Sequence, residues 1–176
     1  MFFMLGDDFT DLFRHCQRSA FHLELQDTYT TPEEAEPFNL FLAGQPDDYA
    51  WMQGWTDLVS DTAKRGVTFQ RVRVVTEPLV DYQRWTLAVS RLNIEAGEDI
   101  RYLPRHLTAS DELPIDDYWL FDDEAVAFTL FTQDGAAAGA AVTTDSAIVQ
   151  RSIDVAEAVW SRATPHDQYV RTTVGS

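Results

Sequence analysis

Cysteine and lysine are almost missing from this sequence. Cys16 is the single cysteine, which excludes a disulfide within the chain and a cluster of thiolate metal ligands. It falls in the apolar spacing of a predicted helix, so we expect a buried packing residue rather than a nucleophile. Lys64 is the single lysine, and this reliance on arginine indicates a high-GC genome such as an actinobacterium's. An extreme halophile fits less well, since halophilic surfaces rarely carry so many large aromatic residues.

Basic residues are also scarce, with 13 Lys and Arg against 29 Asp and Glu, which gives a formal net charge of -16. Such a surface repels phosphate backbones and anionic membranes, so we expect no direct nucleic-acid or membrane binding. The apolar opening MFFMLG is too short to span a bilayer, and Asp7 and Asp8 follow where a signal peptide would continue its apolar core. These features predict a cytoplasmic protein.

Hydrophobic residues make up 45% of the 176 residues and aromatic residues 12%, which is typical of a folded globular protein. We expect a single domain over residues 1–176. It would comprise an N-terminal helical part over about 1–66, an α/β core over about 67–165 and a flexible tail over about 170–176.

The N-terminal part shows helical spacing twice. Apolar residues at intervals of three and four predict a helix over residues 8–27, with Thr10 as a candidate N-cap. Residues 30–37 carry two prolines and several acids, which predicts a loop. A second helix is expected from Tyr49 to Ala63, with Gly66 closing it.

The rest of the chain predicts a β-α-β-β-β-α order. A β-branched strand begins at Val67, a helix runs from Leu79 to Glu95, and a short strand begins at Ile100. The helix is long enough for a right-handed crossover between parallel strands. The segments YWLFDD, AVAFTLFT and AAAGAAVTT then predict a hairpin or meander that turns at Asp134-Gly135, before a last helix that Ser146 would cap. The predicted fold class is therefore mixed α/β (α+β), with one mixed sheet.

Several catalytic and metal-binding patterns are missing. The sequence has no GxSxG elbow, no P-loop and no GxGxxG after a strand. His15 and His22 lie seven residues apart on the predicted first helix, too far for one metal ion, and His106 and His166 fall in loops. The acidic groups at 116–117 and 122–124 could hold magnesium, but solvated hairpin ends are the commoner explanation. We therefore expect no metal and no cofactor.

An arginine cluster is the main candidate site. Arg71 and Arg73 alternate along the predicted strand, so they share one face, and a closed core would not hold both unpaired. The candidate ligand-binding residues are Arg71, Arg73, Asp81, Tyr82, Arg84, Arg101, Arg105, Trp119 and Asp122. Three of them, from Asp81 to Arg84, begin the crossover helix, where backbone N–H groups favour an anion. Two interpretations stay open: the arginines pair with Glu77, Asp81, Glu98 and Asp99, or they form a pocket for an anionic small molecule or an acidic partner segment.

Four stretches, AFHLELQDTY, RVRVVTEPLVDYQRW, EAGEDIRYL and DDYWLFDD, resemble in this order an uncharacterised actinobacterial domain family. The resemblance runs from about Phe9 to Tyr169. Members of that family are often encoded beside helix-turn-helix regulators and their small companion proteins, which implies a protein partner of that kind. The family has no established activity, so the resemblance gives no residue a catalytic role.

The second half also resembles, more distantly, one repeat of the phospholipase D-like fold. Transcriptional regulators use a catalytically silent form of that fold as an effector-binding domain. Its active members keep an HxKxxxxD motif, in which the His is the nucleophile and the Lys contacts the phosphate. With Asp122 as the motif's Asp, Ile115 and Asp117 take the His and Lys places; with Asp123, Asp116 and Tyr118 take them.

The resemblance and the missing nucleophile favour a non-catalytic binding or regulatory accessory protein. Its partner would be a helix-turn-helix regulator or the small companion protein. The alternative is an enzyme acting on a phosphorylated or carboxylated metabolite, with the arginines as a clamp and His106 or a turn carboxylate as acid-base group. A toxin or antitoxin component is a third hypothesis.

Overall fold

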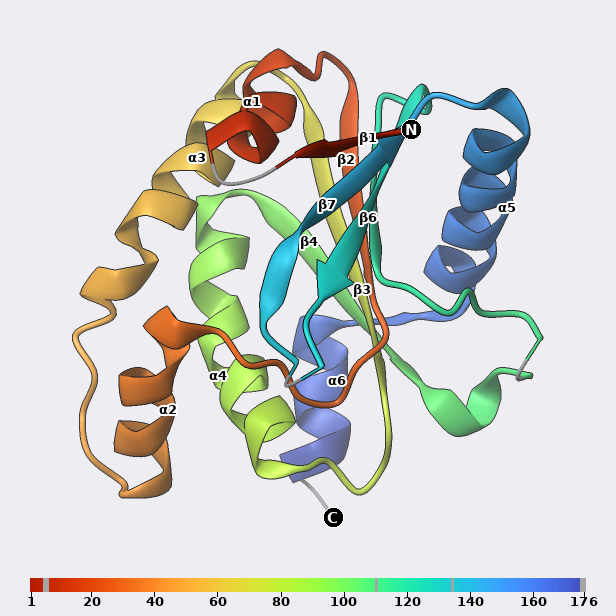
Figure 1. Ribbon diagram of the computed structural model, residues 1–176. Coiled ribbons are helices and arrows are strands. Elements are labelled where there is room, and N and C mark those ends of the chain that lie inside the picture. The colour runs from red at the N-terminus through yellow and green to blue at the C-terminus, as the bar shows by residue number, and fades with distance from the viewer. Residues whose placement is uncertain (5–6, 110, 134, 175–176) are drawn as a thin grey trace.

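The computed structural model describes residues 1–4, 7–109, 111–133 and 135–174 (Figure 1). In chain order its elements are β1 (Phe2–Met4), α1 (Asp7–His15), β2 (Ser19–Glu24), η1 (Pro32–Glu34), α2 (Ala35–Leu42), η2 (Ala50–Met52), α3 (Gln53–Lys64), β3 (Thr68–Val75), α4 (Asp81–Ala96), β4 (Glu98–Pro104), η3 (Arg105–Leu107), β5 (Tyr118–Phe121), β6 (Ala125–Phe131), β7 (Ala137–Thr143), α5 (Ser146–Arg162), β8 (Thr164–Pro165) and α6 (His166–Val174). The η elements are short 3₁₀ helices.

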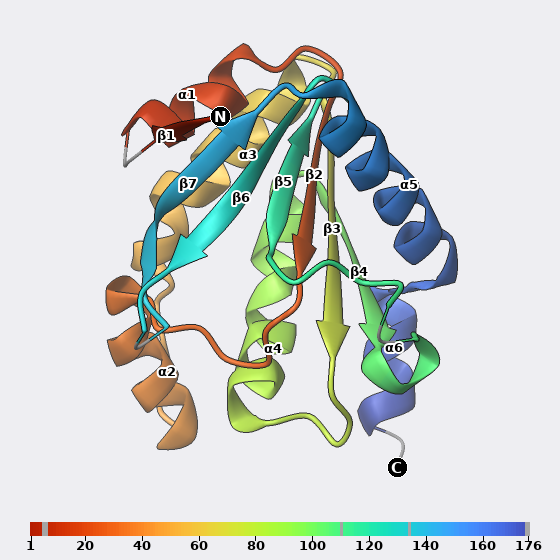
Figure 2. The same ribbon diagram turned by 45° about the vertical axis from the view of Figure 1, so that its right-hand side comes forward.

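One eight-stranded sheet, in the order β1-β7-β6-β5-β2-β3-β4-β8, forms the middle of the molecule (Figure 2). Strands β2, β3 and β4 are parallel, and every other neighbouring pair is antiparallel. The predicted parallel β-α-β unit is β3-α4-β4, and the predicted meander is β5-β6-β7. The mixed fold class is therefore confirmed. Asp134 of the predicted turn lies outside the described residues.

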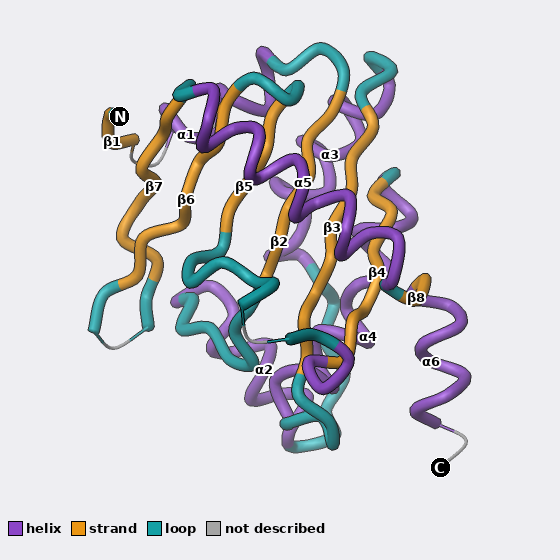
Figure 3. The backbone as a smooth tube through the Cα atoms, turned by 90° about the vertical axis from the view of Figure 1, so that its right-hand side faces the viewer, coloured by secondary structure: helices purple, strands orange, loops and turns teal. Residues whose placement is uncertain are grey.

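The helices cover the two faces of the sheet unequally. Helix α5 crosses one face, while α2, α3 and α4 lie behind the other (Figure 3). Each face has its own apolar core: Phe21, Val72 and Leu120 pack on the α5 side, and Phe13, Phe69 and Phe121 pack on the α1 and α3 side. None of the helices in the described part of the chain is long and apolar enough to cross a bilayer.

The predicted helix over residues 8–27 is wrong beyond His15. Residues 19–24 instead form β2, which lies between β3 and β5 and is buried on both faces. The apolar residues in and around β2 are also spaced as in a helix, so local periodicity alone did not distinguish the strand from a helix. His15 and His22 therefore do not share a helix. Cys16 is buried just after α1, as predicted.

Several other boundaries also differ from expectation. Thr10 lies inside α1 rather than at its N-cap, and α3 begins at Gln53, after η2, rather than at Tyr49. The predicted loop over 30–37 contains η1 and the start of α2. Asp145, not Ser146, caps α5, because its carboxylate accepts the N–H groups of Ala147 and Ile148. Residues 170–174 belong to α6 rather than to a flexible tail: Tyr169 stacks on Tyr102 with ring centroids 4.7 Å apart and anchors that helix.

Candidate functional site: a polar cavity between the sheet and helix α4

A cavity of about 410 Å³ lies on the sheet face that α3 and α4 cover. This volume falls within the range of small-molecule pockets in proteins. Five strands (β2, β3, β5, β6 and β7), helix α4 and the segment between β2 and α2 contribute to its wall. The lining residues used below are Phe9, His22, Glu24, Tyr29, Glu34, Arg71, Arg73, Tyr82, Asp117, Trp119, Thr129 and Phe131.

Strand register brings the polar residues together. His22 of β2 is opposite Arg71 of β3 on one side and Trp119 of β5 on the other. Glu24 is opposite Arg73 in the next row of the same face. Side chains two residues apart on a strand share a face. His22 and Glu24 of β2 and the two arginines of β3 therefore all lie on the sheet face that α3 and α4 cover.

Two arginines and two glutamates form a buried ion-pair network. Arg71 Nε lies 2.6 Å from Glu98 Oε1, and Arg71 Nη1 also contacts Glu24 Oε1. Arg73 Nε lies 2.7 Å from Glu24 Oε2. Asn93 of α4 donates a hydrogen bond of 3.0 Å to Glu98. Two positive and two negative charges thus balance inside the fold, as buried charges require.

The pKa of Glu24 shows how this network is held in its ionised form. Burial alone would raise that pKa, but the charges of Arg73 and Arg71 outweigh burial and lower it to about 2. Burial lowers the pKa of His22 well below its usual range, and the two arginines lower it further against the opposing effect of Glu24. His22 is therefore a neutral imidazole at pH 7. Its ring stacks on Trp119 at 4.0 Å between centroids.

Arg73 keeps hydrogen-bonding capacity that the protein does not use. Its Nη1 is buried and has no hydrogen-bond partner among the described residues. Its Nε approaches Glu24 closely enough for an ion pair but not in hydrogen-bond geometry. A buried donor left unsatisfied costs about 1–3 kcal/mol, and such groups in native proteins are normally paired with protein, water or ligand.

Two carboxylates at the cavity are each paired with a tyrosine. Tyr29 donates to Asp117, whose other oxygen accepts the backbone N–H of Leu25 at 2.9 Å. Tyr82 of α4 donates to Glu34 at 2.6 Å. Burial raises the pKa of Asp117 to about 6, although the hydrogen bond from Tyr29 opposes it, and burial also raises the pKa of Glu34. Burial raises the pKa of both tyrosines as well, so they remain hydroxyl donors.

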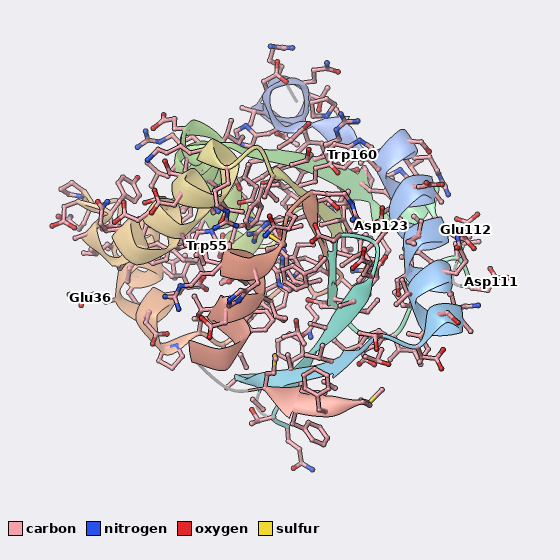
Figure 4. All side chains as sticks on the ribbon, turned by 90° about the horizontal axis from the view of Figure 1, so that it is seen from above. Glu36, Trp55, Asp111, Glu112, Asp123 and Trp160 are labelled. Atoms are coloured by element: carbon pink, nitrogen blue, oxygen red, sulfur yellow. The ribbon has the colours of Figure 1, made fainter. Side chains whose placement is uncertain are left out.

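Aromatic side chains form much of the remaining wall. The Arg71 guanidinium lies 5.7 Å from the ring of Trp119 and 5.9 Å from that of Trp55, within cation–π range. Figure 4 shows Trp55 beside α3, on the interior side. The rings of Tyr29 and Phe131 are 5.7 Å apart. The cavity therefore combines apolar rings with a few polar groups, which is the usual composition of a ligand pocket.

Four of the nine predicted site residues, Arg71, Arg73, Tyr82 and Trp119, line this cavity. Asp81 and Arg84 do not line it. They pair with each other on the exposed first turn of α4, with side chains 53% and 58% exposed.

The other three predicted residues lie elsewhere. Arg71 is paired with Ile100 in the sheet, so Arg101 points to the opposite face, where its guanidinium lies 3.8 Å from the ring of Trp160. Figure 4 shows Trp160 beside α5. Arg105 donates to the carbonyls of Leu25 and Val74 where the strands end. Asp122 accepts three backbone N–H groups, from residues 17, 18 and 19, at 2.6–2.9 Å and so fixes the entry to β2.

The predicted salt pairing is observed only in part. Arg71 pairs with Glu98, and Arg101 lies 3.5 Å from Asp99. Glu77 instead lies 3.8 Å from His106.

Sequence reasoning missed His22, Glu24, Tyr29 and Glu34. The first two carried a usable signal, since the alternation in FHLELQ puts His22 and Glu24 on one face of a strand, but the apolar spacing around them favoured a helix. Tyr29 and Glu34 lie outside regular strands and give no periodic signal.

The two motif alignments can now be placed in space. In the first, Ile115 is 97% exposed and Asp117 is in the cavity. In the second, Tyr118 faces α5 and donates to the Ser152 carbonyl at 2.7 Å. The residues at the His and Lys places carry neither an imidazole nor an ammonium group in either alignment.

No curated protein matches the sequence. Among solved structures, the chain is similar to Nuc, a phospholipase D family member from Salmonella typhimurium, with a TM-score of 0.55 and 14% identity over 89% of this chain and 86% of that one. NucT from Helicobacter pylori is similar with a TM-score of 0.53 and 9% identity over 90% of this chain and 89% of that one. At these identities the likeness concerns the fold, which is phospholipase D-like. The family described as a domain of unknown function, DUF6879, matches residues 7–171, and this chain belongs to that family.

Proposed function

We propose that this protein is a non-catalytic binding domain that senses a small molecule with an anionic group in the cavity. We further propose that it works as a regulatory accessory protein with a helix-turn-helix transcriptional regulator or its small companion protein. The observation that carries the first proposal concerns Arg73, which lines the cavity while its buried Nη1 has no hydrogen-bond partner in the part of the chain that the structure describes. A carboxylate or phosphate oxygen is the acceptor that a guanidinium binds best.

The polar groups of the cavity support binding rather than catalysis. The His and Lys places of the phospholipase D motif hold no imidazole and no ammonium group in either alignment. His22 is the imidazole in the cavity wall, but it stacks on Trp119, and its lowered pKa leaves it a poor proton donor at pH 7. Both arginines are engaged by glutamates.

Charge supports a basic protein partner. The net charge of -16 favours association with a positively charged surface through long-range attraction, which also speeds the encounter. DNA-binding regulators carry such surfaces. An accessory domain of this kind would report ligand occupancy through the contact with the regulator.

Ligand binding is tested by thermal denaturation of the whole chain against a library of carboxylated, phosphorylated and zwitterionic metabolites. We expect at least one compound to raise the melting temperature of the wild type but not of Thr129→Trp, which fills the cavity from β6. Leu130→Trp is the matched control, because the next residue of the strand points away from the cavity. A library in which no compound distinguishes the wild type from Thr129→Trp would refute the cavity as a ligand site.

An enzyme acting on a phosphorylated or carboxylated metabolite is the second candidate, favoured by the fold likeness to Nuc and NucT and by His22 in the cavity. Hydrolysis of bis(p-nitrophenyl) phosphate by the purified wild type separates the two. We expect no turnover above a buffer control. Turnover that disappears in His22→Ala but persists in His15→Ala, whose imidazole is exposed, would establish catalysis and overturn the proposal.

The partner is tested by co-expression with the protein encoded next to this one, followed by size-exclusion chromatography. We expect co-elution at micromolar concentration that weakens as salt rises, since attraction between exposed charges is screened. Separate elution at low salt would contradict this part of the proposal. Growth arrest on expressing the chain alone, relieved by the neighbour, would instead favour a toxin.

A further inference from the structure

We infer that the ligand is a small zwitterion with a ring-bearing or apolar side group, whose carboxylate binds beside Arg73 and whose protonated amine lies near Asp117 and Glu34. This inference rests on the proposed function and names the chemical class that the cavity would take.

The charge balance of the cavity is the first step. Arg71 and Arg73 are already neutralised by Glu24 and Glu98, so the pair offers donors without a surplus of positive charge. Asp117 and Glu34 add two further carboxyl groups to the same cavity. A ligand that brought only negative charge would meet an uncompensated excess of it, at a strong cost in a buried site.

The partners of these two carboxyl groups supply the second step. Tyrosine hydroxyls donate to Asp117 and Glu34, a backbone N–H also donates to Asp117, and the Thr31 side chain also bonds to Glu34. Neither carboxyl group forms an ion pair within the described residues. Each carboxylate oxygen can accept more than one hydrogen bond, so acceptor capacity remains. Burial raises the pKa of both groups, which indicates that a cation beside them would be favoured.

The walls supply the third step. Phe9, Tyr29, Trp119 and Phe131 place apolar ring surface around the polar groups, which suits a flat or apolar side group. Donors at Arg73 and acceptors at Asp117 and Glu34 occur in one cavity of about 410 Å³. This arrangement favours a compact ligand that carries both charges over two separate ions.

The test uses three ligands with one skeleton: L-phenylalanine, hydrocinnamate, which lacks the amine, and phenethylamine, which lacks the carboxylate. Isothermal titration calorimetry of the whole wild-type chain measures each dissociation constant. We expect L-phenylalanine to bind at least about tenfold more tightly than either analogue, because each missing group removes a charge-assisted hydrogen bond.

The variant Asp117→Asn keeps the shape of the side chain and removes its charge. We expect it to lose about tenfold in affinity for L-phenylalanine while its affinity for hydrocinnamate is unchanged or higher. The neighbouring exposed carboxylate offers a matched control, Asp116→Asn, which should bind as the wild type does. The three-ligand series on the wild type decides the question even if Asp117→Asn does not fold.

Each contrary result has a distinct meaning. If hydrocinnamate binds as tightly as L-phenylalanine, the amine contributes nothing to binding. That result would overturn the inference, while the anion-binding proposal would stand. If phenethylamine binds as tightly as L-phenylalanine, Arg73 does not bind a carboxylate. That result would overturn both the inference and the anion-binding proposal. If none of the three binds at millimolar concentration but another library compound distinguishes the wild type from Thr129→Trp, the inference fails and the binding proposal stands.

Discussion

Replacing Glu24 with glutamine removes the carboxylate that Arg71 and Arg73 share. Arg71 keeps Glu98 at 2.6 Å, but Arg73 loses the ion pair at 2.7 Å that balances its charge. The side chain of Arg73 is only 10% exposed, so bulk solvent gives its charge little compensation. The substitution thus leaves one buried guanidinium without a counter-charge, while the size and shape of residue 24 stay the same.

Two arguments give a similar magnitude for the loss in the free energy of unfolding. Removing one partner of a buried ion pair costs about 3–5 kcal/mol. The pKa of Glu24 falls from 4.5 to about 2, and a shift of that size corresponds to about 3 kcal/mol of interaction with the ionised form. Because the folded-state pKa is depressed, this contribution is present above the unfolded-state pKa and is lost as pH falls from about 4.5 towards 2.

Urea unfolding at pH 7 measures the free energy of unfolding of the wild type, Glu24→Gln, Arg73→Met and the double variant. We expect Glu24→Gln to lose about 3 kcal/mol and the double variant to be at least as stable as Glu24→Gln, since Arg71 and Glu98 then remain as a neutral pair. Asp81→Asn is the control: it breaks the exposed pair with Arg84 and should cost under about 1 kcal/mol. A loss below about 1 kcal/mol for Glu24→Gln would refute the view that this network is buried and ionised.

Three further variants test separate parts of the structure. Burial raises the folded-state pKa of Asp117 to about 6, so the protonated carboxyl group stabilises the fold below pH 3.8, and this stabilisation is lost as pH rises through 6. Asp117→Asn should therefore flatten the decline in the free energy of unfolding between pH 3.8 and 6. An unchanged pH profile in the variant would count against this assignment. Gly97→Ala should lower the free energy of unfolding by about 2 kcal/mol or more, since φ is +118° and the new Cβ would lie 2.8 Å from Ala63 Cβ. Gly54→Ala, which has open space around it in α3, should raise that free energy by about 0.5–1 kcal/mol. Equal effects of the two substitutions in chemical denaturation would refute the steric argument. Asp122→Ala should lower the melting temperature, because it removes the acceptor of three backbone hydrogen bonds, and should leave ligand affinity unchanged. A loss of ligand affinity in calorimetry without a loss of stability would instead make Asp122 a site residue.

The sequence by itself determined the features that depend on local periodicity. The β3-α4-β4 unit and the β5-β6-β7 meander follow from strand-like and helical runs bounded by glycine and proline, and the stop at Gly97 follows from its positive φ. Alternation also placed Arg71 and Arg73 on one face. Each of these depends on residues that are close in the chain.

Only the tertiary structure decided which groups meet across the sheet. β2 is a strand because β3 and β5 cover its two edges, and that pairing brings Glu24 to Arg73 and His22 to Trp119. Register also sends Arg101 to the face opposite Arg71, although the two residues lie on adjacent parallel strands. Strand order and register depend on contacts between residues far apart in sequence, because side-chain facing reverses with a shift of one residue. No local pattern could therefore identify Glu24 as the counter-charge of both arginines.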